Sequence, residues 1–444
     1  MAESILIVNA RIVNEGEVVE ADLRVRGDRI DKIASSLSAE AGETTLDARG
    51  AWLMPGMIDD QVHFREPGLT AKGDMQTESA AAVAGGITSF MEMPNVNPLT
   101  TNLAALEDKY ERAAGRAAAN YAFYLGATND NIDDIRSLQP GQACGVKVFM
   151  GASTGAMLVD NEESLNQIFA DSPTLIATHC EDTPIILINE EAARQKYGQD
   201  VPMHEHPNIR SEEACYKSSS LAVELARRHG SRLHVLHLTT AKELEFFEPG
   251  PVAGKRITAE ACVHHLFFDA SDYKRLDTKI KCNPAIKTAA DRAALLQAVA
   301  DDRIDVIATD HAPHTFEEKS ASYFYAPAGL PLVQHALQMT LEHVHQGRFS
   351  INQVVQKTSH SVADLFGVHE RGYIREGYFA DLVLVDPTIT SKVRREDILY
   401  KCGWSPLEGY EFQSSIRATF VNGAMAWIDG QLTGAVGGRR LTFA

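Results

Sequence analysis

The sequence has few cysteines, no excess of basic residues and no long apolar run. Its six cysteines among 444 residues are scattered without a C-x-x-C pair, which argues against a disulfide scaffold or a structural zinc cage. The formal net charge of −18 argues against nucleic acid and anionic membranes as partners. No basic stretch followed by an apolar segment opens the chain, and no run reaches the length of a membrane span. These absences predict a cytoplasmic globular protein.

Both ends of the chain alternate apolar and polar residues around turn signals, as short β-strands do. Near the C-terminus, Asn422-Gly423 favours a hairpin turn between two such segments. We therefore expect residues 1–54 and 366–444 to form one small β-sandwich module. The central domain, residues 55–365, would be inserted between them.

The middle of the chain alternates short apolar segments with helical patterns, such as the one that Ser211 begins and Gly230 ends. Eight β/α units in about 300 residues match the size of a TIM (β/α)8 barrel. A doubly wound open sheet is the alternative, but no G-x-G-x-x-G follows the first strand. The eight strand candidates are 56–64, 86–94, 121–128, 143–151, 174–182, 232–240, 257–266 and 305–314.

Polar side chains lie at or near the C-terminal ends of six of these strand candidates. A buried histidine with a structural role explains any one of them, whereas six at equivalent positions indicate a shared site. In a TIM barrel these strand ends converge on the face where catalysis occurs. The six residues are His63, Asn95, Lys147, His179, His237 and Asp310.

A lysine inside an apolar strand needs an explanation, because an unpaired buried ammonium group is costly. Lys147, in GVKVFMG, either forms an ion pair or reacts as a neutral amine with carbon dioxide to give a carbamate, N6-carboxylysine. The carbamate is favoured, since it would supply an anion that bridges two metal ions.

Asp310, in IATDHAPH, is the candidate catalytic residue. It could bind metal and take a proton from metal-bound water, whose pKa zinc lowers to about 7. It could then return the proton to the leaving nitrogen of an amide. The alternative is a helix N-cap, but the neighbouring His311 and His314 favour a site.

Arg65, Asn95, Asn283 and His314 are the candidate substrate-binding residues. Arg65 lies two residues after His63, and its guanidinium suits a carboxylate, although a solvated arginine is the alternative. Asn95 lies in a proline-bounded turn and is either a ligand contact or a turn former. Four histidines lack strand-end placement and are interpreted as structural or loop residues: His204, His206, His264 and His265.

Four motifs together resemble the dihydroorotases of the amidohydrolase superfamily, especially the longer bacterial type with a β-sandwich formed by both chain ends. They are HFREPG at 63–68, MPN at 93–95, NPAIK at 283–287 and ATDHAPH at 308–314. The resemblance covers nearly the whole chain. It implies reversible interconversion of L-dihydroorotate and N-carbamoyl-L-aspartate in de novo pyrimidine synthesis, and hence a small anionic substrate.

The resemblance also implies the roles of individual residues. His63, Lys147 and Asp310 would hold one zinc ion, and Lys147 with His179 and His237 would hold another. Three further residues would bind the substrate carboxylate, namely Arg65, Asn95 and His314. The pyrimidine ring would lie against Asn283 and the turn that contains Ala328 and Gly329.

Gln61 departs from the family pattern, which has histidine at this position. An amide oxygen is a weaker zinc ligand than imidazole, so we expect one firmly bound zinc and a second that is weak or absent. Two alternatives remain: a hydantoinase- or allantoinase-like cyclic amidase, and a non-catalytic partner of aspartate carbamoyltransferase. We also expect that copies of this chain can associate into a homo-oligomer.

Overall fold

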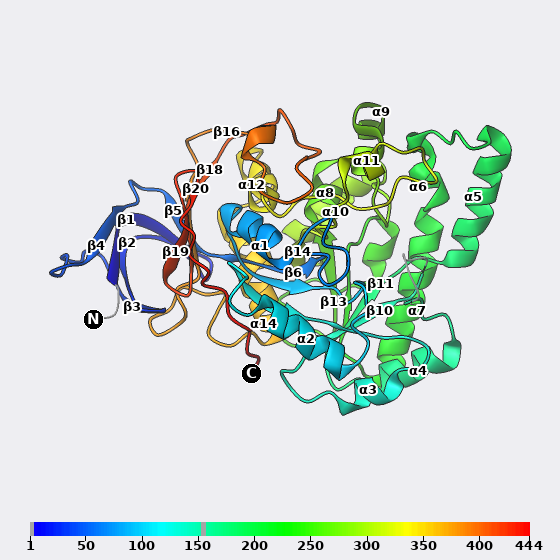
Figure 1. Cartoon of the computed structure of the whole chain (residues 1–444), viewed down its shortest axis with the longest axis horizontal. Coiled ribbons are helices and arrows are strands. Elements are labelled where there is room, and N and C mark those ends of the chain that lie inside the picture. The colour runs from blue at the N-terminus through cyan, green and yellow to red at the C-terminus, as the bar shows by residue number, and fades with distance from the viewer. Residues whose placement is uncertain (1–3, 152–156) are drawn as a thin grey trace.

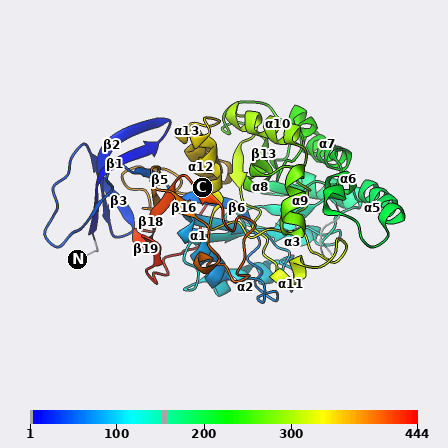
Figure 2. The same cartoon turned by 90° about the horizontal axis from the view of Figure 1, so that it is seen from above.

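The structure is a computed structural model that describes residues 4–151 and 157–444. It consists of a barrel of parallel strands surrounded by helices and a β-sheet beside it (Figures 1 and 2). Strands from the two ends of the chain, blue and red in Figure 1, lie together in that sheet. The predicted α/β class with a β module from both chain ends is therefore confirmed.

The terminal sheet has nine strands in the order β20-β19-β18-β15-β5-β1-β2-β3, with β4 paired to β1. Its apolar side chains bury a core of their own, which includes Ile7, Leu23, Leu384 and Phe420. The strands are β1 (Ser4–Asn14), β2 (Glu17–Arg26), β3 (Arg29–Ala34), β4 (Thr44–Asp47), β5 (Trp52–Pro55), β15 (Leu382–Asp386), β18 (Ser415–Val421), β19 (Ala424–Ile428) and β20 (Gln431–Leu432).

The hairpin between β18 and β19 turns at Asn422 and Gly423, as predicted. Both residues have positive φ, 51° and 77°, which is the conformation of a type I′ turn. A Cβ atom at Gly423 would lie 2.0 Å from the carbonyl oxygen of Gly27, so only glycine fits here.

An ion pair fixes β2 to the loop that precedes β4. The Nε atom of Arg24 lies 2.8 Å from the Oε1 atom of Glu43, whose side chain is 1% exposed. The hydrogen bond from Arg24 lowers the pKa of Glu43 from 4.5 to about 2. Because the folded-state pKa is depressed, this group stabilises the fold above pH 4.5, and the contribution is lost as the pH falls toward 2.

Replacing Glu43 by glutamine is expected to lower the melting temperature at pH 7 by about 1–3 °C. The difference from the wild type should shrink as the pH falls from 4.5 toward 2, because the wild-type carboxylate is protonated there. Differential scanning calorimetry at several pH values measures both effects. Glu17→Gln, at an exposed position of β2, is the control. Equal melting temperatures of wild type and Glu43→Gln at pH 7 would contradict the prediction.

The barrel closes between its first and last strands. Val62 pairs with His311, and the backbone nitrogen of His63 donates to the carbonyl oxygen of His311 over 2.7 Å. Every one of the eight predicted segments contains a strand, so the TIM barrel is confirmed and the open sheet is wrong. The strands are β6 (Met57–Val62), β7 (Ile87–Glu92), β8 and β9, which share one position (Asn120–Phe123 and Leu125–Gly126), β10 (Val146–Phe149), β11 (Ile176–His179), β12 (Leu233–Val235), β13 (Ile257–Cys262) and β14 (Val306–Ala308).

The helices between these strands begin and end at recognisable capping residues. Ser211 caps α7 by accepting a hydrogen bond from the backbone of Ala214, and Gly230 ends it with φ 67°, as predicted. The helices are α1 (Met75–Ala84), α2 (Leu103–Ala113), α3 (Ile132–Ser137), α4 (Glu162–Asp171), α5 (Thr183–Tyr197), α6 (His206–Ile209), α7 (Glu212–His229), α8 (Val263–Phe267), α9 (Tyr273–Leu276), α10 (Ala289–Ala300), α11 (Phe316–Lys319), α12 (Ala336–His345), α13 (Ile351–Val355) and α14 (Ser361–Phe366).

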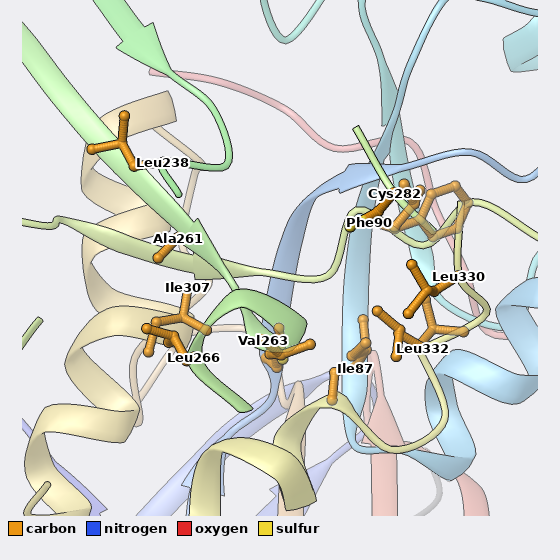
Figure 3. Close-up of a cluster of buried hydrophobic side chains, with 14 of the residues drawn as sticks. Ile87, Phe90, Leu238, Ala261, Val263, Leu266, Cys282, Ile307, Leu330 and Leu332 are labelled. Atoms are coloured by element: carbon orange, nitrogen blue, oxygen red, sulfur yellow. The ribbon is translucent and has the colours of Figure 1, made fainter. Parts of the chain in front are cut away.

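The main hydrophobic core joins the strands of the barrel to the helices around it. Figure 3 shows part of it, in which Ile307 of β14 lies near Leu266 of α8. Leu330 and Leu332 belong to the same cluster as Phe90. Each such side chain, when fully buried, stabilises the fold by about 1.5–3 kcal/mol relative to exposure.

The C-terminal part of the chain also contacts the barrel. The backbone of Tyr121 in β8 accepts a hydrogen bond from Leu441 over 2.9 Å, and Trp404 donates to the carbonyl oxygen of His314. The domain limits at 54/55 and 365/366 remain predictions. Within the described residues, we find no helix that is both long and apolar enough to span a membrane. Two further short strands, β16 (Ser391–Lys392) and β17 (Glu411–Phe412), pair with each other.

Candidate active site

One pocket lies at the C-terminal ends of the barrel strands and is lined by all the metal-ligand, catalytic and substrate-binding residues expected from the sequence. Two further residues, Phe149 and Ala312, also line it. The sequence-derived members are Gln61, His63, Arg65, Asn95, Lys147, His179, His237, Asn283, Asp310, His314, Ala328 and Gly329.

His179 and His237 bring two ring nitrogens together on one side of the pocket. His179 ends β11, and His237 lies two residues beyond β12. The Nδ1 atom of His179 is 3.1 Å from the Nε2 atom of His237. Two nitrogen ligands of a tetrahedral zinc ion, each at about 2.0–2.1 Å, lie about 3.3 Å apart. Burial lowers the pKa of both rings, so each is neutral near pH 7 and offers a lone pair.

Glu181 orients His179, a role that the sequence interpretation missed. Its Oε2 atom lies 3.1 Å from the Nε2 atom of His179 and accepts a hydrogen bond from Arg210. Burial raises the pKa of this carboxyl group, but the charge of Arg210 and the contact with His179 outweigh that effect. The net pKa is about 2. A carboxylate at Nε2 holds the proton there and leaves Nδ1 free for a metal. The signal in the sequence is the glutamate two residues after the histidine in HCED.

Replacing Glu181 by glutamine is expected to weaken zinc binding by about 10- to 100-fold, because the neutral amide no longer fixes the tautomer of His179. Competition with a chromophoric chelator measures the zinc affinity directly. Glu213→Gln, at an exposed position in the first turn of α7, is the matched control. An unchanged zinc affinity in Glu181→Gln would show that His179 is oriented without its help.

Lys147 lies inside β10, as its second residue, and not at the end of the strand as the sequence suggested. It is 1% exposed, and its Nζ atom is 4.7 Å from the centre of the Phe149 ring. Within residues 4–151 and 157–444 it forms neither a hydrogen bond nor an ion pair, so the ion-pair alternative finds no support there. Burial lowers its pKa to about 8, which makes the neutral amine accessible near physiological pH.

Gln61, His63 and Asp310 form a second group of side chains in the pocket. The Nε2 atom of Gln61 donates to the Oδ1 atom of Asp310 over 3.2 Å, and the Nε2 atom of His63 lies 3.0 Å from the same oxygen. Burial raises the pKa of Asp310, but its hydrogen bond with His63 outweighs that effect and the net pKa is lowered. Asp310 therefore stays ionised. No helix starts at Asp310, and Thr315 caps the next one, so the N-cap alternative is wrong.

Arg65 and His314 also line the pocket. The Nη2 atom of Arg65 is 3.1 Å from the Nε2 atom of His314, and its Nε atom donates to the carbonyl oxygen of Pro313. Arg65 is 6% exposed, and burial lowers its pKa to about 10, so it remains a cation at pH 7. The ring of His314 also faces Lys72, and Trp404 holds its backbone.

The remaining predicted residues complete the rim. The Oδ1 atom of Asn95 lies 2.9 Å from the Nδ1 atom of His63. The Oδ1 atom of Asn283 is buried and has no hydrogen-bond partner within the described residues. Gly329 has φ 138°, and a Cβ atom there would lie 2.4 Å from the carbonyl oxygen of Ala312. The turn can therefore approach the pocket only with glycine at this position.

His264 and His265 lie directly after β13, at the start of α8, which corrects the expectation that they lack strand-end placement. Together with Cys262 they place three ligand-type atoms within 4.8 Å of one another. The Nε2 atom of His265 lies 3.1 Å from the carbonyl oxygen of Pro284. None of these residues lines the pocket described above.

A second buried cluster lies inside the barrel and consists of Asp60, His234 and Glu260. The Nε2 atom of His234 is 3.3 Å from Asp60 and 3.8 Å from Glu260. Burial lowers the pKa of His234, but the two carboxylates outweigh this effect and raise it to about 9. An imidazolium between two carboxylates accounts for the cluster. Glu260 also accepts a hydrogen bond from the backbone of His237 and so connects this cluster to the pocket.

The other two histidines without an assigned role differ from each other. His206 is buried and bonds to the hydroxyl of Tyr323 and the carbonyl oxygen of Cys282, which is a structural role. His204 is exposed. All six cysteines are free, and all but Cys402 are buried.

Comparisons with known proteins agree with this architecture. The profile of the amidohydrolase family matches residues 52–426. The chain is 33% identical to a dihydroorotase of Halobacterium salinarum, over 98% of this chain and 99% of that one. It is 32% identical to a dihydroorotase of Bacillus subtilis, over 97% and 99%. An L-hydantoinase (dihydropyrimidinase) of Arthrobacter aurescens, 26% identical, superposes over the full length of both chains with a TM-score of 0.93.

Proposed function

We propose, from the premise that this chain belongs to the amidohydrolase family and within it to the dihydroorotases, that it catalyses the reversible hydrolysis of L-dihydroorotate to N-carbamoyl-L-aspartate. This is a step of de novo pyrimidine synthesis. The observation that carries the proposal is that a metal-ligand cluster and the buried cation of Arg65 share one pocket with Asp310. A cyclic amide with a carboxylate fits such a pocket better than an uncharged ring does.

The donor set around His179 fits a zinc ion. Two neutral imidazoles converge, and Lys147 lies in the same pocket with an amine that can lose its proton and react to form the carbamate. Glu181 supports His179 from behind, as carboxylates commonly support histidine ligands. When bound, zinc supplies a Lewis acid that lowers the pKa of water to about 7 and polarises a carbonyl group.

The donor set around Asp310 fits a second zinc ion less well. Gln61 presents an N–H group to Asp310, and its Oε1 atom lies 3.7 Å from the thiol sulfur of Cys262. The Nε2 atom of His63 can bind a metal only when it carries no proton that it donates to Asp310. The proposal is therefore one firmly held zinc, bound by Lys147, His179 and His237, and a second site that is weak or empty.

Asp310 carries the proton in the proposed reaction. Its lowered pKa keeps it ionised at pH 7, so it can accept a proton from the attacking water. Its position among Gln61 and His63 fixes the carboxylate toward the pocket. In the second half of the hydrolysis it returns the proton to the leaving ring nitrogen.

Arg65, Asn95 and His314 would orient the substrate through its carboxylate. The guanidinium group of Arg65 is buried, so its attraction for an anion is stronger than at an exposed position. The unpartnered Oδ1 atom of Asn283 is placed to accept a hydrogen bond from a ring N–H. The backbone of Ala328 and Gly329 would border the ring on the same side.

The decisive experiment supplies purified protein with zinc and bicarbonate and measures both directions of the reaction. Turnover of L-dihydroorotate with about one zinc per chain, measured by mass spectrometry of the metal, is the expected result. Mass spectrometry of the intact chain under native conditions tests for the carbamate on Lys147. A zinc-loaded protein that turns over neither L-dihydroorotate nor N-carbamoyl-L-aspartate would overturn the proposal.

A hydantoinase-like activity is the second candidate, since the fold matches the Arthrobacter aurescens hydantoinase over its full length. Turnover of uncharged cyclic amides in the same assay would support it. Association with further copies of the chain, or with aspartate carbamoyltransferase, stays a prediction. Size-exclusion chromatography of the purified protein with and without the transferase tests both.

A further inference from the structure

Two lysines that the proposed mechanism does not use are buried beside the turn at Pro327–Gly329. Lys319, the last residue of α11, is 1% exposed, and Lys281 is 9% exposed. Neither forms an ion pair within the described part of the chain. Both ammonium groups instead donate to backbone carbonyl oxygens, which is an unusual use of a buried charge.

Lys319 holds the turn from one side with three hydrogen bonds. Its Nζ atom lies 2.9 Å from the carbonyl oxygen of Pro327, 2.9 Å from that of Gly329 and 3.0 Å from that of Lys281. An ammonium group has three protons, so these contacts use its whole donor capacity. The two acceptors in the turn flank Ala328, which lines the pocket.

Lys281 holds the segment that leads into the turn. Its Nζ atom lies 2.5 Å from the carbonyl oxygen of Tyr323 and 2.7 Å from that of Ala326. Its own carbonyl oxygen accepts hydrogen bonds from the backbone nitrogen of Gly329 and from Lys319. The two lysines therefore connect residues 323–329 to the backbone at Lys281.

Other contacts hold this segment as well. The backbone nitrogen of Ala326 donates to the carbonyl oxygen of Ser322 over 2.8 Å, and the guanidinium carbon of Arg194 lies 3.7 Å from the centre of the Phe324 ring. The carbonyl oxygen of Ala328 contacts the ring of His314, and Leu330 enters the core cluster of Figure 3. Burial lowers the pKa of Lys319 to about 7 and that of Lys281 to about 8, so keeping both groups charged costs stability. Groups with such perturbed pKa values concentrate at functional sites.

We propose that Lys319 is a positioning residue that fixes the Pro327–Gly329 turn as one wall of the substrate pocket, with Lys281 fastening the segment before it. The two lysines thus set how tightly a cyclic substrate is held while taking no part in the chemistry. This inference deepens the proposed function and rests on it for the identity of the ring. The immobility of the turn itself does not depend on that identity.

The test compares Lys319→Met with the wild type by hydrogen exchange and by steady-state kinetics on L-dihydroorotate. Methionine keeps the apolar stem but cannot donate, so three hydrogen bonds to carbonyl oxygens are lost. Amide exchange in residues 323–330 is expected to accelerate at least about tenfold, and KM to rise about tenfold, which corresponds to the loss of one or two hydrogen bonds. The value of kcat should fall less than KM rises, and zinc per chain should stay constant.

Lys274→Met, at an exposed position of α9, is the control and should match the wild type in every measurement. Lys281→Met is the second variant, and it provides the same comparison if Lys319→Met does not fold. Unchanged exchange in residues 323–330, or an unchanged KM with faster exchange, would overturn the inference. If the wild type turns over neither substrate, the proposed function fails, while the exchange comparison still decides whether the lysines hold the turn.

Discussion

Asp310→Asn is expected to lower kcat for L-dihydroorotate on the order of 10²- to 10⁴-fold, the usual contribution of a positioned general base and acid. Asparagine has the same shape, so the packing around Gln61 and His63 persists. Its amide cannot accept the proton from water or return it to the ring nitrogen. The loss should therefore appear in kcat much more than in KM.

The control for this variant is the metal. Zinc is expected to remain bound in Asp310→Asn, because Lys147, His179 and His237 form a separate donor set in the same pocket. Metal per chain and kcat are measured on the same preparation. Asp200→Asn, at an exposed position, controls for the general effect of the exchange. A zinc-loaded Asp310→Asn protein with more than a tenth of wild-type kcat would rule out Asp310 as the proton carrier.

Arg65→Ala is expected to cost about 2–5 kcal/mol of transition-state binding for a substrate with a carboxylate. The guanidinium group is buried where it lines the pocket. Without it, the substrate carboxylate would be bound in a poorly solvated site with no cation to pair with. At 1.4 kcal/mol for each factor of ten, kcat/KM should fall by about 30- to 4,000-fold. An uncharged cyclic amide should be affected much less.

The kinetics of Arg65→Ala therefore separate the two candidate enzymes. A dihydroorotase loses activity selectively on the charged ring, and a hydantoinase-like enzyme keeps its activity on the uncharged one. Arg65 has φ 70°, a conformation that arginine, alanine and lysine all adopt at a cost, so Arg65→Lys is the control that retains the charge. Equal kcat/KM values for L-dihydroorotate in wild type and Arg65→Ala would exclude Arg65 as the reader of the carboxylate.

The sequence predicted the barrel because its signals are local. A strand that ends in a polar residue such as His179, or a helix bounded by Ser211 and Gly230, can be recognised within about twenty residues. The parallel-barrel architecture then places the strand ends on one face without further information. The grouping of the predicted residues in one pocket follows from this geometry.

Trp404 and Lys319, which sequence analysis missed, act through contacts between distant segments. Trp404 holds His314 from a loop 90 residues away, and Lys319 bonds to a carbonyl oxygen 38 residues before it. No periodicity or motif marks such contacts. The orientation of Gln61 is a similar case, since its amide turns its N–H group toward Asp310, 249 residues away.

The contact between the first and last barrel strands also brings Asp310 together with His63. These two residues are 247 residues apart in the chain, yet their side chains meet over 3.0 Å. Contacts between such distant residues form late, because the chain between them must first be ordered. Either half of the barrel alone contains only one member of the pair, so we expect no fragment smaller than the complete barrel to be catalytic.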